Sequence, residues 1–245
     1  MKKSNKIPLK DKILKINPNR WWGDDFDVRF YLLSKISTLK DKTILDIGGG
    51  IGILSSNLDE SNICINLDIS FNDLNQSKII FKKLFHIING SMNEIPLQNN
   101  SVDCVICANL LEVAKMIDIK NNNVCKNNSI ERYPTIIKVL DEIHRVLKPE
   151  GKLLITTPNN EYYKTSKLTY DELKNHLDLK FNSYSLFFYN TFPRLKSQNR
   201  KLNMANIIPK ILSKFKSRDK IINSLIHSDQ GNQKYSVSFF VEAKK

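Results

Sequence analysis

The stretch at residues 43–52 constrains the fold more than any other part of this chain. An apolar run of β-type residues leads directly into a set of glycines, Gly48, Gly49, Gly50 and Gly52. Glycine permits a positive φ and lets a ligand approach the backbone where a Cβ would collide. Residues 51–58 then read as the start of a helix. This order of strand, glycine turn and helix predicts a site for a nucleotide cofactor.

A second strand, residues 64–67, ends in an acid. Asp68 lies 22 residues after Asp46, and in α/β nucleotide folds an acid about 20 positions on accepts hydrogen bonds from ribose hydroxyls. Asp46 begins the pattern Asp-x-Gly-x-Gly-x-Gly, whereas dinucleotide enzymes carry Gly-x-Gly-x-x-Gly. A carboxylate here favours a cofactor with a cationic end over a pyrophosphate. No Gly-Lys-Ser/Thr follows the glycines, which excludes a phosphate-loop NTPase.

Four blocks of the sequence resemble the class I S-adenosylmethionine-dependent methyltransferases, in the small-molecule group typified by ubiquinone and menaquinone biosynthesis enzymes. They resemble the family's cofactor loop, ribose acid, adenine-side loop with fourth strand, and turn with fifth strand: residues 46–52, 67–69, 89–106 and 142–155. The match covers roughly residues 40–160. The resemblance implies a Rossmann-like, doubly wound α/β fold. Its seven-stranded sheet would be mostly parallel, with an antiparallel last strand and helices on both faces.

The resemblance also implies S-adenosylmethionine as the cofactor and places eleven residues around it. These are Asp46, Gly48, Gly49, Gly50, Gly52, Asp68, Ile69, Ser91, Met92, Asn109 and Leu110. Two positions depart from the family pattern. Ser91 stands where the family often has Asp, and Glu112-Val113 stands where it often has Glu-His, which removes a candidate active-site histidine. We expect no metal, and the sequence identifies no catalytic residue.

The remaining patterns predict the other elements. Helices are expected at residues 25–39, 72–84 (with Ser70 as N-cap) and 133–147, and from Thr169, whose spacing to Glu172 is that of a capping box. Residues 118–130 are rich in asparagine without periodicity and read as a loop. Further strands are expected at residues 86–88, 102–108, 152–157, 181–189 and 235–241.

Length and composition favour one core with appendages. With 245 residues, of which 41% are hydrophobic, the chain can bury a full core. We divide it into an N-terminal basic segment and helix, residues 1–40, and a methyltransferase domain, residues 41–245, with a basic helical insertion at about 190–233. No uncharged apolar run reaches 18 residues, and lysines interrupt the N-terminal apolar positions. We therefore expect a cytoplasmic protein without a membrane span or a secretory signal.

The net charge of +13 is concentrated in two segments. Residues 1–20 carry seven Lys/Arg against one Asp, and residues 190–233 carry nine against two, which accounts for the whole excess. Two basic segments on a neutral core favour an anionic partner: a phospholipid surface, an acidic substrate or RNA. Apolar residues at helical spacing in the second segment favour peripheral contact with an anionic membrane, with a substrate lid or a packed surface helix as alternatives. Codon bias is the alternative explanation of the lysines.

Several reactive residue types have ordinary structural interpretations. Cys104 and Cys107 lie in one predicted buried strand, where a spacing of three puts their side chains on opposite faces. We interpret all four cysteines as small buried hydrophobes. His144 and His176 fall in predicted helices and read as structural or solvated. Near the acceptor, the better-placed residues are Glu161, Tyr162 and Tyr163, while Trp21 and Trp22 either close over the cofactor or pack on the sheet edge.

Three functions are compatible with these features. We favour in-line methyl transfer to a small-molecule or lipid-like acceptor. An RNA methyltransferase is the alternative, but the fourth strand runs into Ala108-Asn109-Leu110-Leu111 and not into the Asn/Asp-Pro-Pro-Tyr/Phe of base-amino enzymes. A non-catalytic module that binds the cofactor is the third.

Overall fold

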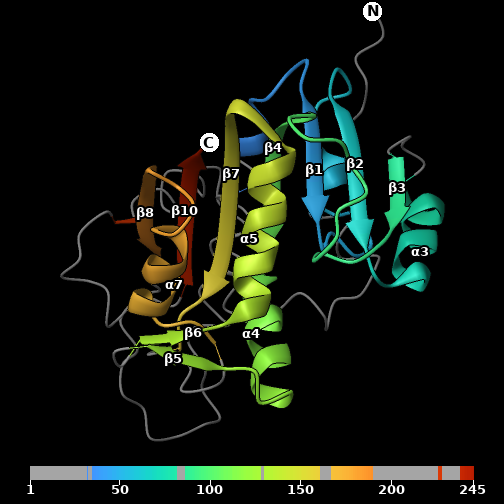
Figure 1. Ribbon diagram of the computed structural model, residues 1–245. Coiled ribbons are helices and arrows are strands. Elements are labelled where there is room, and N and C mark those ends of the chain that lie inside the picture. The colour runs from blue at the N-terminus through green and yellow to red at the C-terminus, as the bar shows by residue number, and fades with distance from the viewer. Residues whose placement is uncertain are drawn as a thin grey trace, which may run out of the picture.

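A single eight-stranded sheet organises the computed structural model, which describes residues 32, 35–81, 86–127, 130–160, 167–189, 226–227 and 238–245. The strand order is β3-β2-β1-β4-β7-β10-β8-β9. Figure 1 shows helices on both faces of this sheet. The strands are β1 (Thr43–Ile47), β2 (Ile63–Asp68), β3 (His86–Asn89), β4 (Val102–Ala108), β7 (Leu147–Pro158), β8 (Ser183–Tyr189), β9 (Ile226–His227) and β10 (Ser238–Lys244).

Strand directions confirm the predicted doubly wound fold. Strands β3, β2, β1, β4 and β7 pair in parallel, whereas β10 runs antiparallel to both β7 and β8. In Figure 1, β1, β2 and β7 point downward and β10 points upward. Seven of the strands are those that the sequence predicts. The eighth, β9, adds a two-residue antiparallel edge to β8.

Helices fill the connections between the strands. They are the 3-10 helix η1 (Ser55–Asn57) and the α-helices α3 (Phe71–Phe81), α4 (Leu111–Lys120), α5 (Pro134–Val146) and α7 (Tyr170–Leu177). A small antiparallel sheet pairs β5 (Cys125–Asn127) with β6 (Ile130–Arg132). Within the described ranges no helix has the length and apolarity that a bilayer span requires.

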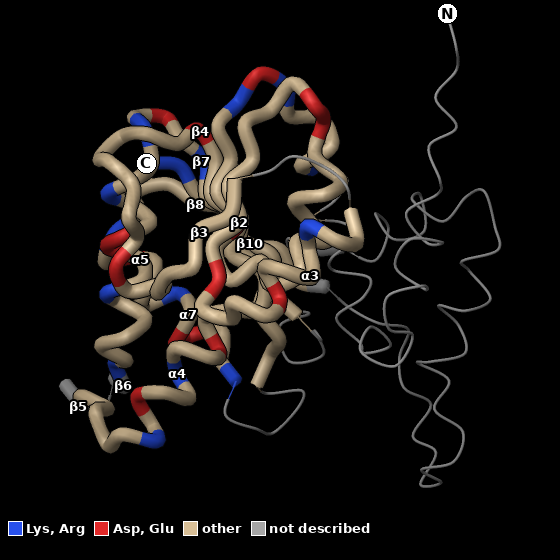
Figure 2. The backbone as a smooth tube through the Cα atoms, turned by 90° about the vertical axis from the view of Figure 1, so that its right-hand side faces the viewer, with Lys and Arg blue, Asp and Glu red and all other residues tan. Residues whose placement is uncertain are grey.

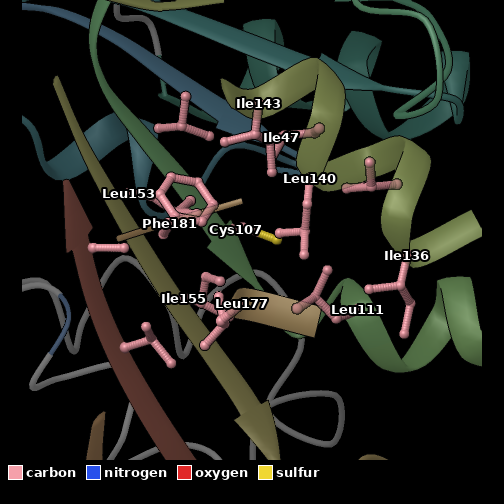
Figure 3. Packing of buried hydrophobic residues seen from close by; sticks show 14 of the residues in the cluster. Ile47, Cys107, Leu111, Ile136, Leu140, Ile143, Leu153, Ile155, Leu177 and Phe181 are labelled. Atoms are coloured by element: carbon pink, nitrogen blue, oxygen red, sulfur yellow. The ribbon is translucent and has the colours of Figure 1, made fainter. Parts of the chain in front are cut away.

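Two hydrophobic clusters lie on opposite faces of the sheet. Helices α4, α5 and α7 cover the first, and Figure 3 shows their side chains packed on β4 and β7 around Cys107. Leu32, Ile36 and Leu54 cover the second, which contains Cys104. The opposite placement of the two cysteines confirms the prediction from their spacing. Because both faces are covered, the central strands read as nearly continuous apolar runs.

Local sequence signals explain most helix boundaries. Helix α5 buries five apolar residues completely, at the spacing of one helical face: Ile136, Val139, Leu140, Ile143 and Val146. The Thr169–Glu172 capping box of α7 is formed, and the Ser70 hydroxyl accepts the Asp73 N–H at 3.3 Å. Figure 2 shows positive and negative residues interspersed over the described core, as expected for a core without excess charge.

The predicted helix at residues 51–58 is wrong, because the segment forms turns and η1 instead. A continuing α-helix would donate the Asn57 N–H to the Ile53 carbonyl. That carbonyl accepts from the Ser56 hydroxyl at 2.8 Å and from the Asn57 side-chain amide at 2.6 Å. The Asn57 N–H bonds to Leu54 instead, so side-chain competition tightens the turn.

The predicted loop at 118–130 also needs correction, since α4 continues to Lys120 and the β5–β6 pair follows. Asp118 is buried, and its carboxylate accepts the backbone N–H and the hydroxyl of Thr135, which fixes this segment. Cys125 is exposed and not buried. Ile226 belongs to strand β9 and not to a helix, because its backbone pairs with Tyr189.

Several predictions lie wholly or partly outside the described residues. Of the helix at 25–39, Leu32, Lys35 and Ile36 are described and helical. Other predictions outside the described residues concern the N-terminal basic segment, the two tryptophans, the acceptor-side residues, and most of the insertion: residues 1–20, 21–22, 161–163 and 190–225 with 228–233. Also outside are residues 82–84 of the predicted helix, 128–129 of the predicted loop and 235–237 of the predicted last strand.

Candidate functional site

The glycine loop lies at the carboxyl end of β1, between two parallel neighbours. Strand β1 pairs with β2 on one side and with β4 on the other, so the chain winds outward in both directions from this point. In open α/β sheets, ligands bind outside the carboxyl ends of the strands where the winding reverses. The loop therefore occupies the position that a cofactor site requires.

Positive backbone angles and two hydrogen bonds shape the loop. The φ angles of Gly48, Gly50 and Gly52 are 69°, 54° and 75°, a region that side chains disfavour. The Gly48 and Gly49 N–H groups both donate to the Leu67 carbonyl, at 2.8 and 3.3 Å. These bonds tie the loop to the end of β2.

Gly50 is held from both sides by side chains of β2. Its N–H donates to Asp68 Oδ2 at 2.8 Å, and its carbonyl accepts from Asn66 Nδ2 at 3.0 Å. The other oxygen of Asp68 accepts the Ser70 N–H at 2.8 Å. Two backbone donors thus fix the orientation of the Asp68 carboxylate at the mouth of the loop.

The glycines differ in what an added Cβ would meet. At Gly50, among the described residues, it would meet only Asp68 Oδ2, at 3.9 Å, so the described part of the chain leaves space open over Gly50. At Gly49 it would come within 2.2 Å of Asn66 Oδ1, and at Gly48 within 2.7 Å of Leu110. Open space over Gly50, beside an oriented carboxylate, fits the ribose of an adenosine-containing cofactor.

Asp46 lies behind the loop, where it is 1% exposed. Its Oδ2 accepts the Ser55 hydroxyl at 2.7 Å, and its neighbour across the strand pair is Asn66. Direct contact between Asp46 and the cationic end of a cofactor stays a prediction. In the structure the carboxylate anchors η1 to β1.

The predicted adenine-side residues gather at the same edge. Ile69 follows Asp68 and is 79% exposed, which gives the site an uncovered apolar surface. The Asn89 side chain donates to the carbonyls of Asp68 and Ile69, at 3.0 and 2.9 Å. Ser91 and Met92 follow β3; the Ser91 hydroxyl accepts the Asn93 N–H, and Met92 packs on the core.

The predicted methionine-side residues follow β4. Asn109 adopts a φ of 53°, and its N–H donates to the Thr156 carbonyl of β7 at 2.8 Å. Leu110 then contacts Gly48. At the start of α4, the Glu112 carboxylate accepts a hydrogen bond from the Thr157 hydroxyl at 3.2 Å. The structure thus brings Leu110 against the loop and ties Glu112 to the end of β7.

Asn66 is the site residue that sequence reasoning missed. A lone amide between the buried apolar residues Ile65 and Leu67 was the available signal. Among the described residues, two buried side-chain oxygens lack a hydrogen-bond partner, Asn66 Oδ1 and Asn93 Oδ1. Both belong to segments that border the loop or the adenine side.

His176, Cys104 and Cys107 serve packing. His176 Nε2 accepts the Tyr133 N–H at 3.0 Å, while Nδ1 lies 2.6 Å from the Glu172 carbonyl; burial lowers the pKa of His176, so the ring is neutral. Burial raises the pKa of the Cys104 thiol to about 12 and raises that of Cys107 as well. No group of metal ligands occurs within the described ranges.

Comparison with known proteins agrees with this geometry. Residues 45–155 match a family model described as a methyltransferase domain. An uncharacterized protein of Methanocaldococcus jannaschii is 28% identical over 200 residues, covering 79% of this chain and 77% of that protein. A ribosomal protein L11 methyltransferase of Prochlorococcus marinus is 36% identical over 134 residues, covering 49% of this chain and 44% of that protein. The chain therefore spans less than half the length of this second relative.

The fold is also shared with a solved structure. A structure of a SAM-dependent methyltransferase from Archaeoglobus fulgidus superposes with a TM-score of 0.57 at 15% identity, covering 91% of this chain and 95% of that one. Strand order, loop position and the family match agree. Residues 45–155 therefore match a methyltransferase domain, and the sheet that contains them has the fold of a solved SAM-dependent methyltransferase.

Proposed function

We propose that this chain transfers the methyl group of S-adenosylmethionine to a small-molecule or lipid-like acceptor, as the resemblance to ubiquinone-type enzymes implies. One observation carries the cofactor part of the proposal. Gly50 is held between Asn66 and Asp68, and the described residues leave space open over it, with the exposed Ile69 following Asp68. This combination offers a backbone approach, a hydroxyl acceptor and an apolar surface at one place.

Each group of predicted residues binds a different part of the cofactor. Asp68 accepts the ribose hydroxyls, because its carboxylate is exposed enough to bind and already oriented by Gly50 and Ser70. Ile69, Ser91 and Met92 line the adenine side. Asn109 and Leu110, with the remaining loop residues, line the methionine side.

Methyl transfer depends more on the orientation of donor and acceptor than on acid–base groups of the protein. The bound cofactor supplies a methyl group on a sulfonium, which is already activated for displacement. The protein aligns the acceptor for in-line attack and excludes water, and such alignment lowers the barrier by several kcal/mol, up to roughly 7–11 in well-oriented systems. A hydroxyl acceptor would also need a base within hydrogen-bond reach. Glu112 is the described carboxylate closest in sequence to Asn109 and Leu110.

The acceptor is tested by following labelled methyl groups. The full chain with methyl-labelled S-adenosylmethionine is incubated separately with a lipid and small-molecule extract, with RNA and with ribosomal protein. We expect label in the extract. Label in RNA would support the RNA methyltransferase alternative. Label in ribosomal protein would indicate an acceptor like the one named for the L11 methyltransferase relative. Cofactor binding without transfer to any of these classes would favour a non-catalytic module.

We also propose that the basic segment at 190–233 contacts an anionic membrane surface. The segment leaves β8 at Tyr189, which pairs with Ile226 at the edge of the sheet where β7 ends. Each Lys or Arg near an anionic surface contributes on the order of 1 kcal/mol, weakened by salt.

Cosedimentation with anionic liposomes tests this contact. We expect salt-sensitive binding that replacement of Ile211, Leu212 and Phe215 by serine reduces, while any binding of RNA is retained. Wild-type protein that ignores anionic liposomes at low salt would contradict the membrane contact. We further propose that the chain divides into an N-terminal basic segment and helix, residues 1–40, and a methyltransferase domain, residues 41–245.

A further inference from the structure

We propose that Asn66 is a positioning residue for the methyl donor, because it holds the glycine loop in its binding geometry from the adjacent strand. The inference rests on the proposed binding of S-adenosylmethionine and deepens it. It assigns the shape of the loop to a side chain that lies outside the glycine motif and outside the eleven predicted cofactor residues.

The location of Asn66 is unusual for an amide. It is 0% exposed in the middle of β2, between Ile65 and Leu67, which belong to the first hydrophobic cluster. Its side chain points to the other face of the sheet, since side chains alternate along a strand. On that face the backbone of the loop passes directly over it.

Asn66 and Asp68 act on the same residue. They are two positions apart and share a face of β2, and they bind the carbonyl and the N–H of Gly50 respectively. Gly50 has a φ of 54°, so the backbone must turn sharply here. Two side-chain bonds to one residue fix the two peptide planes that flank it, and with them the orientation of the Asp68 carboxylate.

The energetic cost of Asn66 argues against a purely packing role. Its Oδ1 is buried without a hydrogen-bond partner among the described residues, and burying an unsatisfied acceptor is unfavourable. The Asp46 carboxylate also lies nearby, since both groups would crowd a side chain added at Gly49. An apolar residue would fill the same space without these costs. What an apolar residue lacks is the donor to Gly50.

Asn66→Asp and Asn66→Leu separate these roles. Both variants keep the approximate shape of the side chain, and neither can donate to Gly50 when the aspartate is ionised. Asn66→Ser, which is smaller and uncharged, is the second choice where either variant does not unfold cooperatively. The matched control is Asn62→Asp: the Asn62 side chain also bonds backbone groups, those of Leu39, Lys42 and Asp59, but Asn62 lies just before the other end of β2.

The measurement is the dissociation constant for S-adenosylmethionine by titration calorimetry, relative to wild type at each pH. We expect about tenfold weaker binding for Asn66→Leu at every pH, the effect of about one hydrogen bond. Burial beside Asp46 and Asp68 raises the pKa of a carboxyl introduced at position 66. When protonated, that carboxyl can donate to Gly50, so Asn66→Asp should approach wild type as the pH falls from about 8 to about 6.

Asn62→Asp should bind like wild type whatever its loss of stability. Folded Asn66→Leu and Asn66→Asp proteins with affinities within about twofold of wild type would overturn the inference. So would an Asn66→Asp affinity that follows Asn66→Leu at every pH. A wild-type chain that does not bind the cofactor would instead contradict the proposed function on which the inference rests.

Discussion

Adjacent glycines of the loop are required for different physical reasons. At Gly49 an added methyl group would lie 2.2 Å from Asn66 Oδ1 and 2.8 Å from Asp46, both buried. We predict that Gly49→Ala destabilises the fold by about 1–3 kcal/mol, as overpacking of a filled interior does. Chemical denaturation measures this loss. A variant as stable as wild type would mean that the polar pair behind the loop can move apart.

Substitution of Gly50 should impair cofactor binding more than it impairs folding. Within the described residues a Cβ there meets only Asp68 Oδ2, at 3.9 Å, so Gly50→Val is strained by its positive φ but crowds no described atom closely. We predict a cooperative thermal transition together with loss of cofactor binding, because the new side chain occupies ligand space. Calorimetric titration of the folded variant checks this. Affinity equal to wild type would show that the ligand does not approach Gly50.

At the scale of elements, a buried ion pair joins α4 to α7. Lys115 Nζ lies 2.6 Å from Glu172 Oε1, with side chains 6% and 15% exposed. The Tyr133 hydroxyl donates to the same oxygen at 2.8 Å. Burial acts to raise the pKa of Glu172, but the hydrogen bonds from Lys115, the Thr169 N–H and Tyr133 outweigh it and hold the pKa below its usual value.

Removing one partner of this pair should be costly. We predict that Lys115→Met lowers the free energy of unfolding by about 3 kcal/mol or more, because it leaves a buried carboxylate without its cation. Lys174→Met is the control, since Lys174 of α7 pairs at the surface with Asp178, the residue that follows α7. A loss no larger than that of the control, measured by urea unfolding, would contradict the buried-pair account.

The packing of α7 also predicts a pH dependence. Burial holds the pKa of His176 below its ordinary value of 6.5, so below about that pH the unfolded chain binds a proton that the folded chain does not. Stability should therefore fall as the pH drops from about 7 to about 5. His176→Gln should show a shallower decline in urea unfolding over this range. Equal slopes would indicate that His176 titrates alike in both states.

How far sequence predicts an element depends on where its signal lies. Helix α5 was predictable from the helical period of its apolar residues, and the central strands from their nearly continuous apolar runs, because both patterns directly reflect burial. The turn at η1 was not, because the outcome depends on two side chains competing for the Ile53 carbonyl. The β5–β6 pair was hidden in an asparagine-rich segment that carries no apolar alternation.

Within the site, too, some residues were predictable from local sequence and others were not. Asp68 was predictable because a fixed spacing links it to the loop, and the structure places its carboxylate on Gly50. Asn66 was not, since its role depends on which loop atom lies above one face of β2. Contacts of this kind can be identified only when it is known which strands and loops are adjacent in space.

At the scale of the whole molecule, one sheet carries every part of the proposed site on one edge. The glycine loop follows β1, Asp68 and Ile69 follow β2, and Asn109 and Leu110 follow β4. Since β1, β2 and β4 are neighbouring parallel strands, their carboxyl ends meet at that edge. Covering both faces of the sheet leaves this edge as the place for a ligand.

Titration calorimetry of the full chain with S-adenosylmethionine, and separately with NADH, tests this account most directly. The account predicts micromolar binding of S-adenosylmethionine and none of NADH. It also predicts that Asp68→Ala weakens binding by about 1–2 kcal/mol or more, by removing a charge-assisted hydrogen bond, whereas Asp59→Ala at the opposite edge does not. Binding of NADH without S-adenosylmethionine, or full affinity in folded Asp68→Ala, would contradict it.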